Sequence, residues 1–230
     1  IEINDSVMQA LAKTIDAKDK YTKGHSERVA KYSREISARM GKSKKEQDEI
    51  YRVALLHDMG KIRIPDAIIN KPGKLTEQEF SMIKLHPVTG YHILKGIRRF
   101  KDLGIGAKYH HEHYDGTGYP ANLAGEKIPF GARILRICDV YCALTSDRPY
   151  RSAFTQEQAM ELMAEEVKNF DLKMFLAFQR VIHSGSRKAI ELSDVDELIQ
   201  EIIKEKTENG IKEETGYRNE RYFTERNGNP

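Results

Sequence analysis

The amino-acid sequence predicts an all-α fold, and three observations carry this prediction. Apolar residues recur at helical spacing along most of the chain, strand-like alternation is nearly absent, and two capping boxes mark helix starts. The 230 residues, 39% of them hydrophobic and 32% charged, suffice for one large soluble domain whose core needs no disulfide support. We expect this domain at residues 1–183, followed at residues 184–230 by a helix and a charged, flexible tail.

Helix signals mark the first part of the chain in order. The apolar spacing predicts a first amphipathic helix around residues 7–15 and a second over residues 26–40. Gly41 is a stop signal for the second helix, because glycine readily adopts the left-handed conformation that follows a helix end. Ser43 and Glu46 form a capping box that starts a third helix. This third helix leads to His57.

Later elements follow from the same kinds of signal. Thr76 and Glu79 form a second capping box, and the Pro after His86 marks the first turn of another helix. Residues 115–120 read DGTGYP and predict a loop, because Gly and Pro interrupt regular structure there. Further helices are expected over residues 130–146, 155–168, 171–183 and 193–206.

The composition and sequence patterns predict the cellular compartment of the protein. Its apolar stretches are far shorter than the roughly 20 residues that span a bilayer, and its start has no signal-peptide pattern. Cys138 and Cys142 lie four residues apart on one expected helical face, where they read as small core residues. Two thiols without a disulfide framework favour the cytoplasm. Because the chain starts at Ile1, we expect an excised fragment whose missing part is a sensor domain or a membrane anchor. The sequence leaves open whether the protein forms a homodimer.

Charge is distributed unevenly along the chain. Residues 1–155 carry 27 Lys+Arg against 19 Asp+Glu, whereas residues 156–230 carry 11 against 16. The basic part suits an anionic substrate, although solvated surface charges explain most of the excess equally well. Basic clusters interleaved with aromatic residues are not evident, so we expect no polymeric nucleic acid as a partner.

Histidines concentrate in one region, because seven of the eight lie between positions 25 and 113. A single histidine is more often a hydrogen-bonded core or surface residue than a metal ligand. Here, however, His57 precedes Asp58 directly, and His110 precedes His111. Imidazole and carboxylate together suit Fe, Mn, Zn, Ni or Co rather than Mg or Ca alone. The pairs therefore predict a transition-metal site.

The motifs around these pairs resemble a known family. Residues 55–62 read LLHDMGKI and resemble the HD motif of metal-dependent phosphohydrolases. Residues 110–120 read HHEHYDGTGYP and resemble the signature of the HD-GYP subfamily. Residues 21–26 and 132–151 are similar to the segments that flank these motifs in that family. The resemblance covers roughly residues 15–180 in the right order.

This resemblance implies an HD-type helical bundle with a metal site between helices and a substrate loop at Gly-Tyr-Pro. It implies that Asp58 bridges two divalent metals, most simply Fe or Mn, with Zn, Ni or Co as alternatives. It further implies catalytic roles for Asp58 and Lys61, and substrate contacts for Lys61, Tyr119, Arg148 and Arg151. The implied metal ligands are His25, His57, Asp58, His86, His110, His111 and Asp139. His92, His113 and His183 match no ligand position.

The implied activity is hydrolysis of cyclic di-GMP, or of cyclic GMP-AMP, to a linear dinucleotide. A second cut, which would release GMP from the cyclic di-GMP product, stays open. One alternative is a catalytically idle HD-GYP module that senses cyclic dinucleotides or docks partner proteins. Another is an HD hydrolase acting on mononucleotides, which leaves the Gly-Tyr-Pro loop without a role.

Three positions depart from the family pattern. Tyr21 stands where members with a third metal carry Glu, so a site of two metals is expected. Cys142 replaces a common Asp, which puts local hydrogen bonding in doubt but leaves Asp139 untouched. Leu172 replaces the Pro of a Phe-Asp-Pro run, a change that a peripheral helix should tolerate.

Overall fold

The structure is a computed structural model of the chain, and it describes residues 5–19, 22–96, 101–148 and 151–183. These residues form ten α-helices and three short 3-10 helices, η1 to η3. In chain order the elements are α1 (Asp5–Asp16), α2 (His25–Arg39), α3 (Lys44–Leu56), η1 (Met59–Arg63), α4 (Asp66–Ile69), α5 (Glu77–Ile83), α6 (His86–Leu94), α7 (Lys101–Tyr109), η2 (Gly125–Lys127), α8 (Phe130–Leu144), α9 (Gln156–Glu165), η3 (Val167–Asn169) and α10 (Leu172–Ile182). The predicted all-α class is confirmed, since the described residues contain no strand and only an isolated bridge between Arg148 and Arg151.

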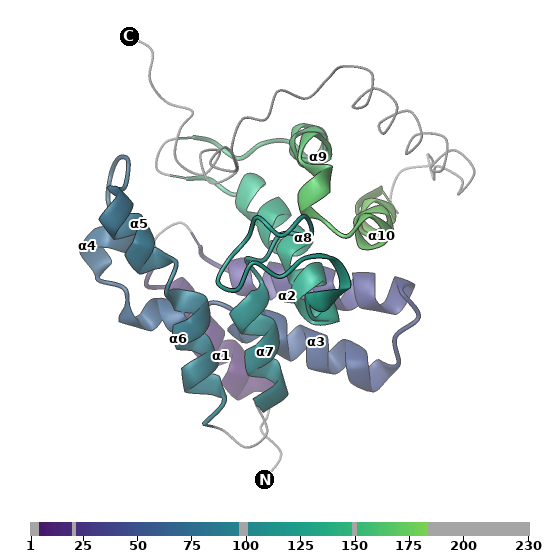
Figure 1. The fold of residues 1–230 in the computed structure, drawn as a ribbon, viewed down its shortest axis with the longest axis horizontal. Coiled ribbons are helices and arrows are strands. Elements are labelled where there is room, and N and C mark those ends of the chain that lie inside the picture. Colours follow the sequence, from purple (N-terminus) through teal and green to yellow (C-terminus); the bar gives the residue numbers. More distant parts are fainter. Residues whose placement is uncertain (1–4, 20–21, 97–100, 149–150, 184–230) are drawn as a thin grey trace.

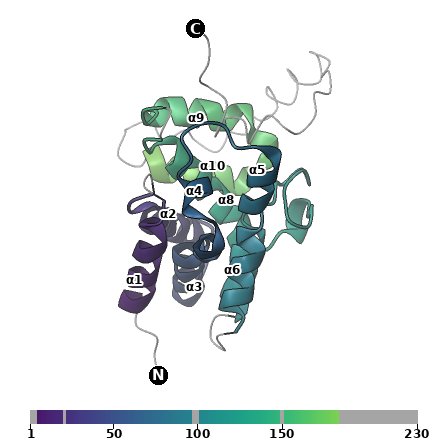
Figure 2. The ribbon, with the colours of Figure 1, turned by 90° about the vertical axis from the view of Figure 1, so that its left-hand side faces the viewer.

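Helix α8 is the centre of the bundle (Figure 1), and eleven of its fifteen residues are buried. It packs against α2, α7, α9 and α10, while α2 also packs along α3. Helix α1 covers α2 and α3, and α6 packs on α7 and η1. In Figure 2, α9 lies across one end of the molecule, and α1, α3 and α6 lie toward the other. This arrangement brings the C-terminal end of α3 and the start of α6 together, because η1 joins directly onto α3 and packs on α6.

Local sequence signals explain several helix starts. The Ser43–Glu46 and Thr76–Glu79 capping boxes are both formed, with each Ser or Thr side chain accepting from the backbone N–H three residues on. Helix α2 ends at Arg39, and Gly41 follows with φ of 75°, as the glycine predicted. The expected helix at 193–206 and the charged tail lie outside the described residues.

Helix α7 was not among the predicted elements. Its sequence contains Gly104 and Gly106, which lower helix propensity by about 1 kcal/mol each relative to alanine. Tertiary packing explains both. A Cβ at Gly106 would overlap the Val53 side chain of α3, and one at Gly104 would lie 3.1 Å from the Tyr91 ring of α6. The glycines therefore let α7 approach its two neighbours closely.

Among the helices of the described residues, none combines the length and apolar character needed to cross a membrane.

Candidate metal centre

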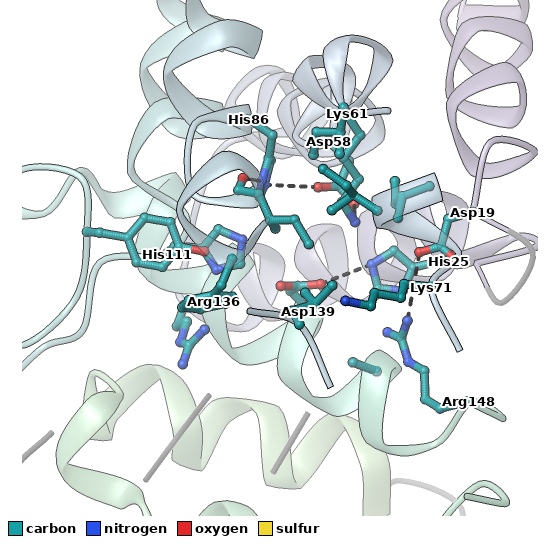
Figure 3. Close-up of a pocket in the computed structure, with 18 of the residues that line it drawn as sticks. Asp19, His25, Asp58, Lys61, Lys71, His86, His111, Arg136, Asp139 and Arg148 are labelled. Carbon is teal, nitrogen blue, oxygen red and sulfur yellow. Dashed lines mark hydrogen bonds and ion pairs between the residues drawn. The ribbon is translucent and has the colours of Figure 1, made fainter. Parts of the chain in front are cut away.

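Residues that are far apart in sequence converge at the end of α3. His57 and Asp58 follow the last residue of α3, and His110 and His111 occupy the turn after α7. The other three lie on helices, with His25 and His86 at the starts of α2 and α6 and Asp139 inside α8. Figure 3 shows five of these side chains, His25, Asp58, His86, His111 and Asp139, around the centre of a pocket. Possible ligand atoms within 4.8 Å of one another form three groups, which are His86 with His110 and His111, His25 with His57 and Asp58, and His57 with His110 and Asp139. The structure thus brings together all seven predicted ligands.

Asp58 lies between two histidines. Its Oδ2 is 3.5 Å from His57 Nε2, and its Oδ1 is 3.3 Å from His86 Nε2. Asp139 Oδ1 lies 3.0 Å from His25 Nε2 and 3.9 Å from His57 Nε2. Because the two oxygens of Asp58 face different imidazoles, this carboxylate has the orientation that a bridging ligand requires.

Three of the imidazoles are oriented by the same kind of hydrogen bond to the backbone. The Nδ1 atoms of His57, His86 and His110 lie 2.6, 2.8 and 2.6 Å from backbone carbonyls three residues earlier. These carbonyls, of Ala54, Ile83 and Ala107, belong to the last turns of α3, α5 and α7, where helical carbonyls lack an intrahelical partner. Each Nδ1–H therefore donates to a helix end, which leaves each Nε2 unprotonated and directed at the cluster.

The donor atoms fit a metal ion. His57 is fully buried, and its Nε2 has no hydrogen-bond partner. His86 Nε2 lies 3.3 Å from His110 Nε2, although neither atom carries the proton that a hydrogen bond between them would need. Buried acceptors that face one another in this way are satisfied by a cation that they share.

Protonation states favour coordination. Burial, with the neighbouring imidazoles of His57 and His86, lowers the pKa of His110 to about 3, and burial also lowers the pKa of His111 well below its ordinary value. Burial alone would raise the pKa of Asp58 and Asp139, yet both lie well below the usual range, chiefly because Lys61 faces Asp58 and His25 faces Asp139. Neutral imidazoles and ionised carboxylates are the forms that bind metals.

Lys61 reaches the cluster from η1. Its Nζ lies 2.6 Å from Asp58 Oδ2. Burial opposes the charge, but Asp58 raises the pKa of Lys61 above its ordinary value, so the ammonium is retained.

Sequence reasoning missed the residue that lets η1 pack beside the cluster. A Cβ at Gly60 would overlap the His86 carbonyl oxygen and lie 2.6 Å from Gly90 N, so only glycine allows η1 to lie against α6.

The Gly-Tyr-Pro loop folds back onto the histidines. A Cβ at Gly118 would lie 2.5 Å from both Glu112 Cα and His111 O, which explains the glycine. The Tyr119 ring stacks on His111, with ring centroids 4.8 Å apart and an angle of 16° between the planes. Glu112, which sequence reasoning left unassigned, accepts from the backbone N–H groups of Ala121 and Leu123 at 2.7 and 3.0 Å. These contacts fix the loop beside the cluster.

A second set of polar residues stabilises the start of this loop. Asp115 accepts from the Thr117 backbone N–H at 3.0 Å, a local contact that caps the loop. Thr117 Oγ1 lies 2.9 Å from Nδ1 of His113. Nε2 of this buried histidine lies 2.8 Å from Arg136 Nη2. Burial and the Arg136 charge lower the pKa of His113 to about 2. His113 is therefore a neutral, buried histidine outside the cluster.

The two predicted phosphate-binding arginines differ in position. Arg148 lines the cavity, with Nη1 3.9 Å from Asp19 Oδ2. Arg151 donates to the carbonyls of Ala143 and Leu144, each at 2.9 Å, and lies outside the cavity lining. Arg151 thus caps the C-terminal end of α8, where carbonyls lack helical partners.

The cavity over the cluster has a volume of about 240 Å³. Five members of the cluster line it together with Lys61 and Tyr119, namely His25, Asp58, His86, His111 and Asp139. Another part of the lining is apolar. The apolar wall comes from η1 to α5 and contains Ile64, Ile68, Ile69, Leu75, Phe80 and Ile83. Sequence reasoning assigned no role to this wall or to the cavity residues Asp19, Lys71 and Arg136.

The departures from the family pattern have local outcomes. Tyr21 lies outside the described residues. Cys142 is buried, and burial raises the pKa of its thiol to about 12, so it stays protonated. The Arg28 side chain nearby donates to Ser146 Oγ at 2.9 Å. Asp171, before Leu172, caps α10 through Met174 N and binds Arg133 at 2.5 Å, so the run keeps a defined structure without the Pro.

Comparisons with known proteins identify the class to which this fold and site belong. The family model described as HD domain matches residues 9–174, and the chain belongs to this family. It is 44% identical over 167 residues to the cyclic di-GMP phosphodiesterase response regulator of Xanthomonas campestris, covering 71% of this chain and 44% of that protein. It is 38% identical over 180 residues to the 3'3'-cGAMP-specific phosphodiesterase 3 of Vibrio cholerae, covering 78% of this chain and 39% of that protein. The chain therefore spans less than half the length of these relatives.

Solved structures show the same fold. A cyclic GMP-AMP-specific phosphodiesterase of V. cholerae superposes with a TM-score of 0.60 at 18% identity, covering 77% of this chain and 48% of that one. The HD domain of an L. monocytogenes phosphodiesterase, in complex with cyclic di-AMP, gives 0.54 at 21% identity, covering 79% of this chain and 99% of that one. These relatives and structures confirm the family resemblance drawn from the HD and Gly-Tyr-Pro motifs.

Proposed function

We propose that this chain is a metal-dependent phosphodiesterase that hydrolyses cyclic di-GMP to a linear dinucleotide, and then to GMP. Cyclic GMP-AMP is the second candidate substrate. One observation carries the proposal, which is the convergence of five histidines and two aspartates in one cluster, beside a cavity that five of them line together with Lys61. Relatives named as cyclic di-GMP and cGAMP phosphodiesterases support the substrate class.

The proposed cofactor is a pair of divalent transition metals, either Fe or Mn, with Zn, Ni or Co as alternatives. When bound, such a pair acts as a Lewis acid on a phosphoryl oxygen and lowers the pKa of water. Asp58 is the proposed shared ligand, and its two oxygens already face different histidines. His25, His57 and Asp139 would complete one position, and His86, His110 and His111 the other.

The remaining roles belong to side chains around the cluster. Lys61 is proposed to neutralise negative charge that builds up on the phosphoryl oxygens in the transition state. Tyr119, stacked on His111, forms part of the substrate surface. Arg148 lines the cavity and is the better placed of the two arginines for a phosphate. A phosphate contact by Arg151 stays a prediction, because it requires the side chain to leave the carbonyls of α8.

Two other functions remain as candidates. An idle module that only senses or docks has no need for the whole ligand cluster, and the proximity of all seven side chains supports the enzyme over such a module. A hydrolase of mononucleotides leaves the Gly-Tyr-Pro loop and the apolar wall without a purpose. We favour the cytoplasm, where cyclic dinucleotides act as signals and where the free, buried thiols of Cys138 and Cys142 stay reduced. An upstream sensor domain, a homodimer and the domain boundary at residue 183 stay predictions.

The deciding experiment measures metal content and turnover together on a panel of cyclic di-GMP, cyclic GMP-AMP, linear dinucleotides and mononucleotides. We expect turnover of a cyclic dinucleotide that depends on the bound metal. Asp58→Ala and His110→Ala should lose both metal and turnover. His92→Ala and His183→Ala, which replace histidines outside the cluster, serve as matched controls and should change neither. Full activity of Asp58→Ala would overturn the proposal, and binding of cyclic dinucleotides without turnover would favour the idle module.

A further inference from the structure

Arg136 is a cavity residue to which neither the sequence analysis nor the proposed mechanism gives a role. It lies on α8 one helical turn before Asp139, so both side chains emerge on the same face of the helix. Its side chain lines the cavity, although the residue is only 7% exposed. In Figure 3, Arg136 lies beside His111. A guanidinium keeps its charge at all ordinary pH values, and removing that charge from water is costly, so a buried arginine at a cavity calls for a reason.

A chain of hydrogen bonds fixes the orientation of this guanidinium. A guanidinium can only donate, so Nη2 of Arg136 must donate to Nε2 of His113, at 2.8 Å. The proton of His113 is then on Nδ1 and is donated to Thr117 Oγ1 at 2.9 Å. The Thr117 hydroxyl in turn donates to Asp115 Oδ1 at 2.6 Å. Each member has one defined polarity, and together they hold Arg136 to the start of the Gly-Tyr-Pro loop.

Arg136 lies on a different side of the cluster from the other cations of the cavity. Lys61 is bound to Asp58, and Arg148 is near Asp19. Figure 3 shows Arg136 beside His111, whereas Lys61, Lys71 and Arg148 lie on the side of Asp58, Asp19 and His25. A substrate with a single phosphate at the cluster needs positive charge on one side only. A cyclic dinucleotide carries two phosphodiester groups on one ring, so it presents a second anion away from the reacting one.

We propose that Arg136 binds the phosphate of the cyclic dinucleotide that is not cleaved. This inference rests on the proposed function and adds to it a residue that selects a substrate with two phosphates. The planar fork of a guanidinium matches two oxygens of one phosphate at once, and the tether through His113 holds the fork in place before the substrate arrives. Arg136 therefore contributes to binding and substrate choice, whereas Lys61 contributes to the chemical step.

The test compares two substrates in the metal-loaded chain, cyclic di-GMP with two phosphodiesters and bis(4-nitrophenyl) phosphate with one. Arg136→Met should raise KM for cyclic di-GMP by roughly 10- to 100-fold, the loss expected for a charged hydrogen bond. It should leave kcat for cyclic di-GMP, and both constants for bis(4-nitrophenyl) phosphate, within about two-fold. Arg136→Lys should restore only part of the loss, because it keeps the charge but not the fork.

Arg133→Met is the matched control, because Arg133 lies on the same helix but binds Asp171 and lies outside the cavity lining. It should lower the melting temperature and leave KM unchanged.

An equal loss on both substrates in Arg136→Met would overturn the inference, because Arg136 would then act at the reacting phosphate or on the fold. An unchanged KM for cyclic di-GMP would overturn it as well. If Arg136→Met does not fold, Arg136→Lys decides, and unchanged KM values there oppose the proposal. A wild-type chain that binds metal but leaves cyclic dinucleotides intact would instead overturn the proposed function, and the inference with it.

Discussion

Single side chains in this protein acquire their chemical state from burial and from one or two partners. Lys61 is the clearest case, since burial opposes its charge and Asp58 Oδ2, 2.6 Å away, retains it. His113 shows the opposite outcome, because burial and the nearby Arg136 keep the imidazole neutral. Both states follow from neighbours that are distant in sequence or folded onto the residue by a turn.

Replacing Lys61 should separate metal binding from catalysis. Lys61→Ala is expected to keep the metal content and to lower kcat by about 10²- to 10³-fold, more than it raises KM, because the charge acts where negative charge develops. Metal analysis and steady-state kinetics measure the two effects. Lys31→Ala, on the exposed face of α2, is the control and should change neither. Loss of the metal together with the lysine would show that the assigned role is wrong.

The neutral state of His113 should make folding stability depend on pH. In the unfolded chain His113 takes up a proton below about pH 6.5. In the folded chain its pKa is about 2, so it takes up none until much lower pH. The unfolded state therefore binds more protons, and the free energy of unfolding falls as pH decreases from about 6.5 toward 2, by up to about 1.4 kcal/mol per pH unit. Urea unfolding of metal-free chains at pH 7 and pH 5 measures this loss. His113→Gln keeps a donor and an acceptor without the proton uptake, so an equally steep fall in that variant would contradict the assignment.

The ends of the helices supply or orient most of the histidines in the site. Helices α3, α5 and α7 each finish with carbonyls that orient a histidine, and α2 and α6 each begin with a histidine. Asp139, inside α8, and the Gly-Tyr-Pro loop are exceptions. The loop is fixed by a close backbone approach at Gly118 and by Glu112.

Gly118→Ala should destabilise the protein more than the same substitution at a glycine whose new Cβ would meet no neighbouring atom. The added Cβ would lie 2.5 Å from Glu112 Cα and His111 O, so backbone must shift, at a cost of about 1–3 kcal/mol in unfolding free energy. Turnover should fall as well, because His111 and Tyr119 move with the loop. Gly125→Ala is the matched control, since its φ of 58° is strained for alanine but nothing lies within 4 Å of the new Cβ. Its cost should be about 1 kcal/mol with turnover retained. Thermal unfolding and kinetics of both variants compare the effects, and an active Gly118→Ala of normal stability would refute this reading.

At the scale of the whole molecule, the bundle brings seven possible ligands from five regions of the chain into one place, and their charges limit how many cations they hold. Within the cluster only Asp58 and Asp139 are anionic. Each further divalent cation in a small cluster adds repulsion that an anionic ligand must offset.

We therefore expect about two metals per chain after gentle purification, following two-metal chemistry. Anomalous diffraction at the metal edge, with elemental analysis of the same sample, counts them. By the family resemblance, Tyr21 takes the sequence position at which members with a third metal carry Glu, and a phenol with a pKa near 10 is a poor ligand at neutral pH. Tyr21→Glu is the complementary variant, and we expect a third occupied position only there. Three well-occupied positions in the unaltered chain would contradict this prediction.

Much of this protein could be predicted from the sequence because the relevant signals are local. The capping boxes at Ser43 and Thr76 and the stop at Gly41 involve neighbours within a few residues, so they are visible along the chain and were confirmed. The ligand candidates were visible because the motif spacing itself carries the family resemblance. Local signals could not reveal α7, whose glycines are explained only by the surfaces of α3 and α6. Nor could they show that Arg151 binds the carbonyls at the end of α8. The contact of Arg136 with His113 joins residues that only the packed bundle brings together. The sequence alone determined which side chains are available for chemistry, whereas tertiary packing decided which of them face the cavity, because burial and distance depend on the whole fold.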